Sequence, residues 1–103
     1  MIVFVTPLYW FTFSTQLKVA IDKFYSFLIT DRTLKIKECA LLVCGGKEEE
    51  SWYVGIVSSY KLIAEFSKWQ DVGTIIVPGL HKKDEILGTD GLQRAEAFGN
   101  SLR

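Results

Sequence analysis

The side chains best suited to chemistry in this sequence lie near its N-terminus. The segment Thr6-Pro7-Leu8-Tyr9-Trp10-Phe11-Thr12-Phe13 joins a proline-fixed turn to four aromatic rings and two threonine hydroxyls. We expect this segment to face solvent, and an exposed apolar patch of this kind is typical of a binding surface. The segment Thr6 to Phe13 is suited to bind a flat apolar ring. The alternative is that Trp10, Phe11 and Phe13 fold back into the core or into the contact between two copies of the chain.

Three short apolar runs are predicted to be strands that position this segment. They are Met1 to Val5, Glu38 to Cys44 and Val72 to Val77. Continuous apolarity is typical of a strand that is buried on both faces rather than one with a wet side. The first run is stopped by Thr6-Pro7, so the aromatic segment begins where a buried strand ends.

Helical spacing follows each strand. The first helix is predicted at Ser14 to Leu28, with Thr12 or Ser14 as its N-cap. The second begins near Glu48 to Glu50, where acidic charge suits the positive end of the helix dipole. The third begins at about Thr89, with Asp90 as another cap. The predicted apolar faces are Leu17, Ala20, Ile21, Phe24 and Leu28 in the first helix, Trp52, Ile56, Ile63 and Phe66 in the second, and Leu92, Ala95, Gly99 and Leu102 in the third.

The alternation of strand and helix predicts an α/β fold with a parallel sheet and right-handed crossovers. Open parallel sheets place their ligands outside the carboxyl ends of the strands. In this chain those ends are the loops Thr6 to Phe13, Gly45 to Glu50 and Pro78 to Gly88. We therefore expect a binding site where these three loops meet.

Composition excludes several classes of partner. The 103 residues allow one core, and 12 basic against 12 acidic residues give a net charge of zero. No global field therefore draws the chain to nucleic acid or to an anionic membrane. No apolar stretch approaches the roughly 20 residues of a membrane span, and no secretory signal precedes the first strand.

Cys39 and Cys44 match no disulfide or metal spacing, so we expect reduced core thiols, no metal site and a cytoplasmic protein.

The motifs resemble those of flavodoxin-like NAD(P)H-dependent FMN reductases. Thr6-Pro7-Leu8-Tyr9-Trp10, then Ser14 with Gln16-Leu17-Lys18, then Ile21-Asp22-Lys23-Phe24, is similar to the P-x-Y, S-x-x-x-K and D-R/K pattern of that family, nearest to its iron-sulfur flavoprotein branch. The resemblance continues through Tyr60 to Ala64 and Asp71 to Gly79, so it covers nearly the whole chain.

This resemblance implies a truncated flavodoxin-like three-layer sandwich with three parallel strands, equivalent to strands 3-4-5, and flanking helices. It implies an FMN site, with NAD(P)H as co-substrate and the cofactor carrying the chemistry. It assigns no catalytic residue. A second ring-flanking loop matches more loosely, and its two glycines either admit a close backbone approach or only form a turn. The cofactor contacts implied are Thr6, Pro7, Leu8, Tyr9, Trp10 and Ser14 in the first loop and Gly45 and Gly46 in the second.

One departure from the family pattern changes the expectation. Family members begin with a strand, a phosphate-binding loop, a helix and a second strand, so residues 1–103 resemble a single partial domain without that portion. The FMN phosphate would rest at that missing helix N-terminus. The iron-sulfur branch's cysteine motif is also missing, so no cluster is expected. Without strands 1 and 2, the run Ile2 to Val5 becomes an exposed edge, and such an edge recruits another chain. We therefore expect a homo-oligomer formed through Ile2 to Val5 and the aromatic loop.

Two functions stay open on the sequence. The first is an FMN-binding oxidoreductase domain with hydride transfer between nicotinamide and flavin. The second is a non-catalytic remnant that serves as an oligomerisation or protein-interaction module without flavin. The single histidine, His81, is expected to be an exposed loop residue beside Lys82, Lys83 and Asp84.

Overall fold

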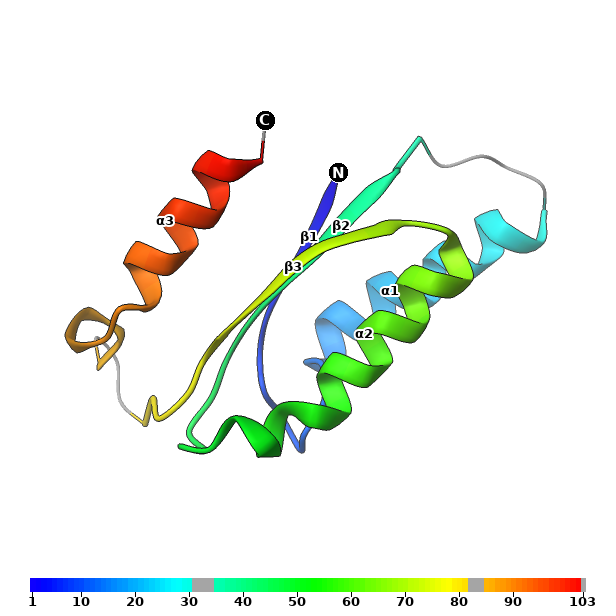
Figure 1. Ribbon diagram of the computed structural model, residues 1–103. Helices are drawn as coiled ribbons and strands as arrows, with labels where there is room; N and C mark the ends of the chain where they lie inside the picture. The colour runs from blue at the N-terminus through cyan, green and yellow to red at the C-terminus, as the bar shows by residue number, and fades with distance from the viewer. Residues whose placement is uncertain (31–34, 82–84, 103) are drawn as a thin grey trace.

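Three parallel strands form the centre of the molecule (Figure 1). The computed structural model describes residues 1–30, 35–81 and 85–102. Strands β1 (Ile2–Pro7), β2 (Glu38–Cys44) and β3 (Gln70–Val77) lie in the order β1-β2-β3, with β2 paired in parallel to both neighbours. The predicted α/β class with three parallel strands is confirmed. β1 runs two residues further than expected, because Pro7 needs no N–H at the end of an edge strand and pairs with Cys44.

The helices cover the two faces of the sheet unequally. α1 (Thr15–Ile29) and α2 (Val54–Ser67) lie on one face, and α3 (Gly91–Ser101) lies on the other (Figure 1). Short 3-10 turns, η1 (Glu50–Tyr53) and η2 (Glu85–Gly88), precede α2 and α3. This is the three-layer arrangement expected. Ser14 is the N-cap of α1, and its hydroxyl accepts a hydrogen bond from the Leu17 N–H.

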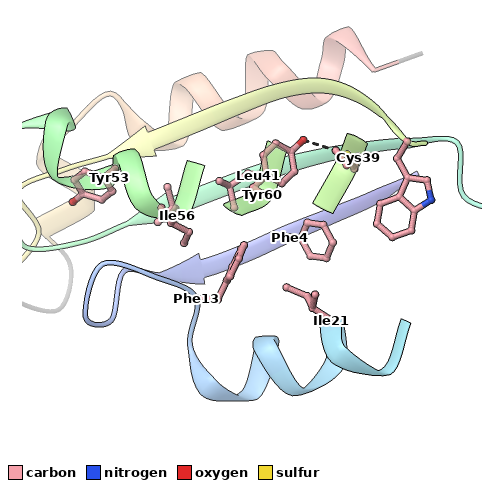
Figure 2. Close-up of a cluster of buried hydrophobic side chains, with 11 residues drawn as sticks. Phe4, Phe13, Ile21, Cys39, Leu41, Tyr53, Ile56 and Tyr60 are labelled. Carbon is pink, nitrogen blue, oxygen red and sulfur yellow. Dashed lines mark hydrogen bonds between the residues drawn. The ribbon is translucent and has the colours of Figure 1, made fainter. Parts of the chain in front are cut away.

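The main core lies between the sheet and the α1–α2 layer. Figure 2 shows Phe4 and Leu41 of the sheet clustered with Ile21 of α1 and with Ile56 and Tyr60 of α2, together with Phe13. Each fully buried aliphatic or aromatic side chain of this kind contributes roughly 1.5–3 kcal/mol. Of the stripe predicted for α1, Ile21 is buried and Leu17 and Phe24 pack against the core, whereas Ala20 is exposed; the side chain of Leu28 lies outside the described part.

The prediction that β1 is buried on both faces is wrong. Phe4 is 2% exposed on the α1–α2 side, but Val5, on the opposite side, is 68% exposed and Val3 is 39% exposed. The reason is that α3 packs on β3 and leaves the corresponding face of β1 uncovered (Figure 1).

The apolar face predicted for the second helix is confirmed at Ile56, which is buried, and at Ile63, which packs against the core, and is wrong at Trp52 and Phe66. The buried stripe consists of Tyr53, Ile56, Tyr60 and Ala64, whereas Trp52 and Phe66 are exposed. The 3-10 turn at Glu50–Tyr53 has about three residues per turn instead of 3.6, so Trp52 is out of phase with the helix that follows. Tyr53 and Tyr60 were not predicted in this face, yet both are fully buried.

α3 is seated on β3 by close backbone contact. A Cβ at Gly73 would lie 2.6 Å from the Phe98 ring, and Gly73 has φ of +151°. The Arg94 guanidinium donates to the Ile76 carbonyl oxygen at 2.8 Å. The predicted cap Asp90 makes no capping hydrogen bond; the Thr89 hydroxyl instead accepts from the Gly91 N–H at 3.1 Å. Leu92, expected on the buried face, is half exposed beside the bare part of the sheet.

A polar cluster of the buried Tyr60 and Cys39 with the exposed Asp71 joins α2 to the start of β2 and β3. The Tyr60 hydroxyl donates to the Asp71 carboxylate at 2.7 Å and lies 3.4 Å from the Cys39 sulfur. The same Asp71 oxygen accepts from the Gly73 N–H at 3.0 Å, beside the register shift between Cys39 and Ala40. Burial raises the pKa of the Tyr60 phenol, and its hydrogen bonds to Cys39 and Asp71 raise that pKa further. Burial likewise raises the pKa of the Cys39 thiol.

Both cysteines are free; Cys39 is buried and Cys44 is half-buried. Within the described ranges, no helix is long and apolar enough to cross a membrane. The expected homo-oligomer concerns a second copy of the chain and stays a prediction.

We predict that Tyr60→Phe lowers the free energy of unfolding at pH 7 by about 1 kcal/mol, because the Asp71 carboxylate loses a donor while the ring still fills its place. Urea denaturation followed by circular dichroism measures this difference. An unchanged midpoint would show that the hydroxyl contributes nothing to stability.

The same variant tests a pH dependence. The Tyr60 pKa is raised above the ordinary value of 10.0 for a tyrosine, so above about pH 10 the unfolded chain loses a proton that the folded chain keeps. Stability is therefore expected to fall as pH rises past 10. Tyr60→Phe should make that fall shallower by up to about 1.4 kcal/mol per pH unit. Part of the fall remains in the variant, because the pKa values of Tyr53 and Cys39 are also raised.

Candidate functional site

Backbone hydrogen bonds bring the three predicted loops together at the carboxyl edge of the sheet. The Leu8 N–H donates to the Cys44 carbonyl at 2.7 Å, which ties the first loop to the end of β2. The Gly45 N–H donates to the Val77 carbonyl at 3.2 Å, and the Leu80 N–H donates back to the Gly45 carbonyl at 2.8 Å. The expected meeting of the three loops is therefore present, although residues 82–84 of the third loop lie outside the described part.

The first loop contains a tight and strained turn. The Tyr9 N–H donates to the Thr12 carbonyl and the Thr12 N–H donates to the Tyr9 carbonyl, at 3.1 and 3.0 Å. The two residues between them, Trp10 and Phe11, have φ of +46° and +68°. Positive φ at both central positions is the geometry of a type I′ turn, in which asparagine and glycine are preferred. Two large aromatic residues there are strained, and such strain is found most often at functional sites.

The strained turn presents one ring to solvent and anchors the other. Trp10 is 92% exposed. Phe11 stacks on Trp52 of η1, with ring centroids 5.7 Å apart and planes 26° from parallel. On Trp52 lies the Lys47 ammonium, 4.8 Å from the ring centroid. Phe13, by contrast, is buried in the core, as the alternative reading of the sequence expected. The segment therefore has a buried anchor, Phe13, and an exposed tip, Trp10.

An open pocket of about 740 Å³ lies beside this tip. Its volume is in the range of small-molecule sites, about 300–1,000 Å³. It is lined by Leu8, Tyr9, Trp10, Phe11, Thr15, Gly46, Lys47 and His81.

Unpaired backbone donors border the pocket. Within residues 1–30, 35–81 and 85–102, the N–H groups of Trp10, Phe11, Gly46 and Lys47 have no backbone acceptor. Oriented N–H groups beside an aromatic wall can donate to the carbonyl groups of a planar heterocycle. The arrangement is therefore suited to bind a flat ring that carries hydrogen-bond acceptors along one edge.

The eight predicted contact residues separate into two groups. Leu8, Tyr9, Trp10 and Gly46 line the pocket together. The other four are not part of its lining. Thr6 is buried, and its hydroxyl accepts from the Ser14 N–H at 3.1 Å. Pro7 ends β1 and Ser14 caps α1.

Gly45 is enclosed by the protein itself. A Cβ there would lie 2.7 Å from the Tyr53 hydroxyl and 3.0 Å from the Leu8 Cβ. The close backbone approach that this glycine permits is therefore to its own neighbours. Burial raises the pKa of the Tyr53 phenol, which donates to the Lys47 carbonyl at 3.1 Å and so holds the second loop in place.

Thr15, Lys47 and His81 were not predicted as site residues. His81 is an exposed loop residue, as expected, but a Cβ at Gly46 would lie 3.1 Å from its ring. Lys47 could have been predicted, because it directly follows the two glycines in a loop at the carboxyl edge of the sheet. Nothing in the sequence places His81 beside Gly46. Among the described side chains, no group of three or more His, Cys, Asp or Glu residues is placed to hold a metal ion.

The pocket fits the ring of a flavin better than its phosphate. Its aromatic wall and unpaired N–H groups suit the ring. The nearby segment Glu48 to Glu50 brings three carboxylates, which repel a dianion. The residues that would hold the ring are therefore Leu8, Tyr9, Trp10 and Gly46.

Comparisons with known proteins agree with this fold. The chain is similar to the Trp repressor binding protein from Bacillus subtilis, with 22% sequence identity, a TM-score of 0.77, and a match that covers 98% of this chain and 68% of that one. At this identity the likeness shows the fold alone. No curated protein matches the chain significantly. Residues 1–98 match the family described as having a flavodoxin-like fold, and the chain therefore belongs to that flavodoxin-like family.

Proposed function

We propose that the chain is a flavin-binding domain of oxidoreductase type, similar to NAD(P)H-dependent FMN reductases. The observation that carries this proposal is the strained turn, which holds Trp10 out of the core at the mouth of the pocket. A conformation that costs of order 1–3 kcal/mol per residue is kept where it serves function. Family membership supports flavin chemistry of this kind.

The chain's own residues have three tasks in this proposal. Trp10 and Tyr9 cover the face of the ring and exclude water from it. The N–H groups of Gly46 and Lys47 donate to its acceptor edge, and Lys47, anchored on Trp52, adds positive charge there. A bound flavin supplies the hydride-accepting chemistry.

A flavin titration tests the proposal. Tryptophan fluorescence and flavin absorbance should both change on addition of FMN. Because the described residues suit the ring and not the phosphate, we predict that riboflavin and FMN bind with similar affinity, within about threefold. Absence of any spectral change at high flavin concentration would exclude the oxidoreductase proposal for this chain. A strong preference for FMN would show that the chain holds the phosphate after all.

A variant of the turn separates strain from binding. We predict that Trp10→Asn raises the free energy of unfolding by about 0.5–1 kcal/mol, because asparagine tolerates positive φ. The same change should weaken flavin binding about fivefold, since an aromatic contact is worth about 1 kcal/mol. Trp10→Phe is the matched control: it keeps both the strain and a ring, so stability should stay unchanged and binding should fall less. If Trp10→Asn lowers stability, the turn is not strained in solution.

The second candidate function is a non-catalytic interaction module. It is favoured by the bare face of β1 and by the exposed aromatic turn. The flavin titration separates the two candidates, because this module binds no flavin.

A further inference from the structure

Trp52 contacts two of the side chains that line the pocket beside Trp10. It lies in η1 and stands outside the described lining of that pocket. Its ring stacks on Phe11, with centroids 5.7 Å apart and planes 26° from parallel. The Lys47 ammonium lies 4.8 Å from the centroid of the same ring. Phe11 belongs to the first loop and Lys47 to the second, so one exposed ring joins side chains of both loops.

The stack on Phe11 supports the strained part of the first loop. Phe11 has φ of +68° and forms the centre of the turn together with Trp10. Its ring is 40% exposed, so the core encloses it only in part. The Trp10 ring lies edge-on to Phe11, with centroids 6.4 Å apart. Because a strained conformation persists only where its surroundings hold it, the position of Trp10 depends on Trp52 through Phe11.

Lys47 is held through both its backbone and its side chain. Its carbonyl oxygen accepts from the Tyr53 hydroxyl at 3.1 Å and from the Gly79 N–H at 2.9 Å. Its ammonium lies on Trp52. Among the described residues Lys47 forms no salt bridge, although Glu48 to Glu50 follow it directly in the sequence. The ammonium is therefore placed by an aromatic ring and is not neutralised by a carboxylate.

The Lys47 charge distinguishes between two forms of a flavin ring. Two-electron reduction of the ring with uptake of one proton leaves a negative charge at its acceptor edge. Lys47 is part of the pocket lining, and Glu48 to Glu50 are outside the lining that the structure describes. A cation held at the pocket attracts the negative ring more strongly than the neutral one.

We infer that Trp52 is a positioning residue for the pocket, which holds the strained turn through Phe11 and the ammonium of Lys47, so that the pocket binds the reduced form of a flavin more tightly than the oxidised form. This inference rests on the proposed flavin function and adds to it a residue outside the described pocket lining. An aromatic pair and a cation–π contact are each worth roughly two- to tenfold in an equilibrium constant. Loss of the Trp52 ring therefore has two effects, one on affinity and one on the preference for the reduced form.

Anaerobic titration of the full chain with riboflavin, oxidised or reduced by dithionite, tests both effects. We expect the wild-type chain to bind the reduced form about fivefold more tightly, which corresponds to about 20 mV in a two-electron couple. Trp52→Leu should weaken binding of the oxidised form about fivefold and lower the preference to less than about twofold. Trp52→Phe keeps an aromatic ring and should restore most of the affinity and of the preference.

Hydrogen exchange separates the two contacts without any ligand. The amides of Tyr9 and Thr12 close the strained turn. Trp52→Leu should speed their exchange about fivefold, because the stack is lost. Lys47→Gln removes the charge and keeps the stack, so it should abolish the redox preference and leave this exchange unchanged. Phe66→Leu is the matched control, because it removes an exposed ring on α2 outside the described pocket lining and should change neither measurement.

Three results would overturn the inference. If the wild-type chain binds riboflavin and Trp52→Leu binds both forms equally well as the wild type, Trp52 has no positioning role and the flavin proposal stands. Equal affinity of the wild-type chain for both forms, or unchanged exchange of the turn amides in Trp52→Leu, would remove one of the two contacts from the inference. Absence of riboflavin binding by the wild-type chain would overturn the proposed function as well, and this result is read before any variant is compared.

Discussion

The candidate site depends on the backbone hydrogen bonds that join the three loops at the carboxyl edge of the sheet. Leu8 is tied to Cys44, Gly45 to Val77 and Leu80 back to Gly45. Each of these residues lies next to a strand end, so the parallel register of β2 with both neighbours fixes where the loops can go. The side chains in the pocket come from segments about 35 residues apart, and only this edge brings them together.

The strain at Trp10 and Phe11 is supported by the same framework. The turn is closed by two hydrogen bonds between Tyr9 and Thr12, and it is held from both sides by the buried Phe13 and the stack of Phe11 on Trp52. A strained conformation persists only where its surroundings over-determine it. Here two aromatic anchors hold the turn, and the third ring, Trp10, is left free to contact a ligand.

The fold could be predicted from the sequence because its strands are short apolar runs that end at Pro7, Gly45 and Pro78. Residue-level burial was harder to predict. The Tyr53 and Tyr60 rings can be buried because their hydroxyls donate hydrogen bonds to the Lys47 carbonyl and the Asp71 carboxylate. The hydrophobic periodicity of the sequence does not reveal these partners. Of the site, the aromatic loop was identifiable from composition. His81 was not, since its place beside Gly46 follows from the return of the chain after β3.

β1 links the two main features of the molecule. Its end leads directly into the strained turn, while none of the described strands pairs with its outer edge and Val3 and Val5 are exposed. Hydrogen bonds that open most easily are those at exposed edges with little apolar cover. Leu8 is tied to β2 only one residue beyond the paired end of β1. Any layer that covers β1 therefore also steadies the base of the turn that presents Trp10, so occupation of the sheet edge and order in the pocket are physically coupled through this one strand.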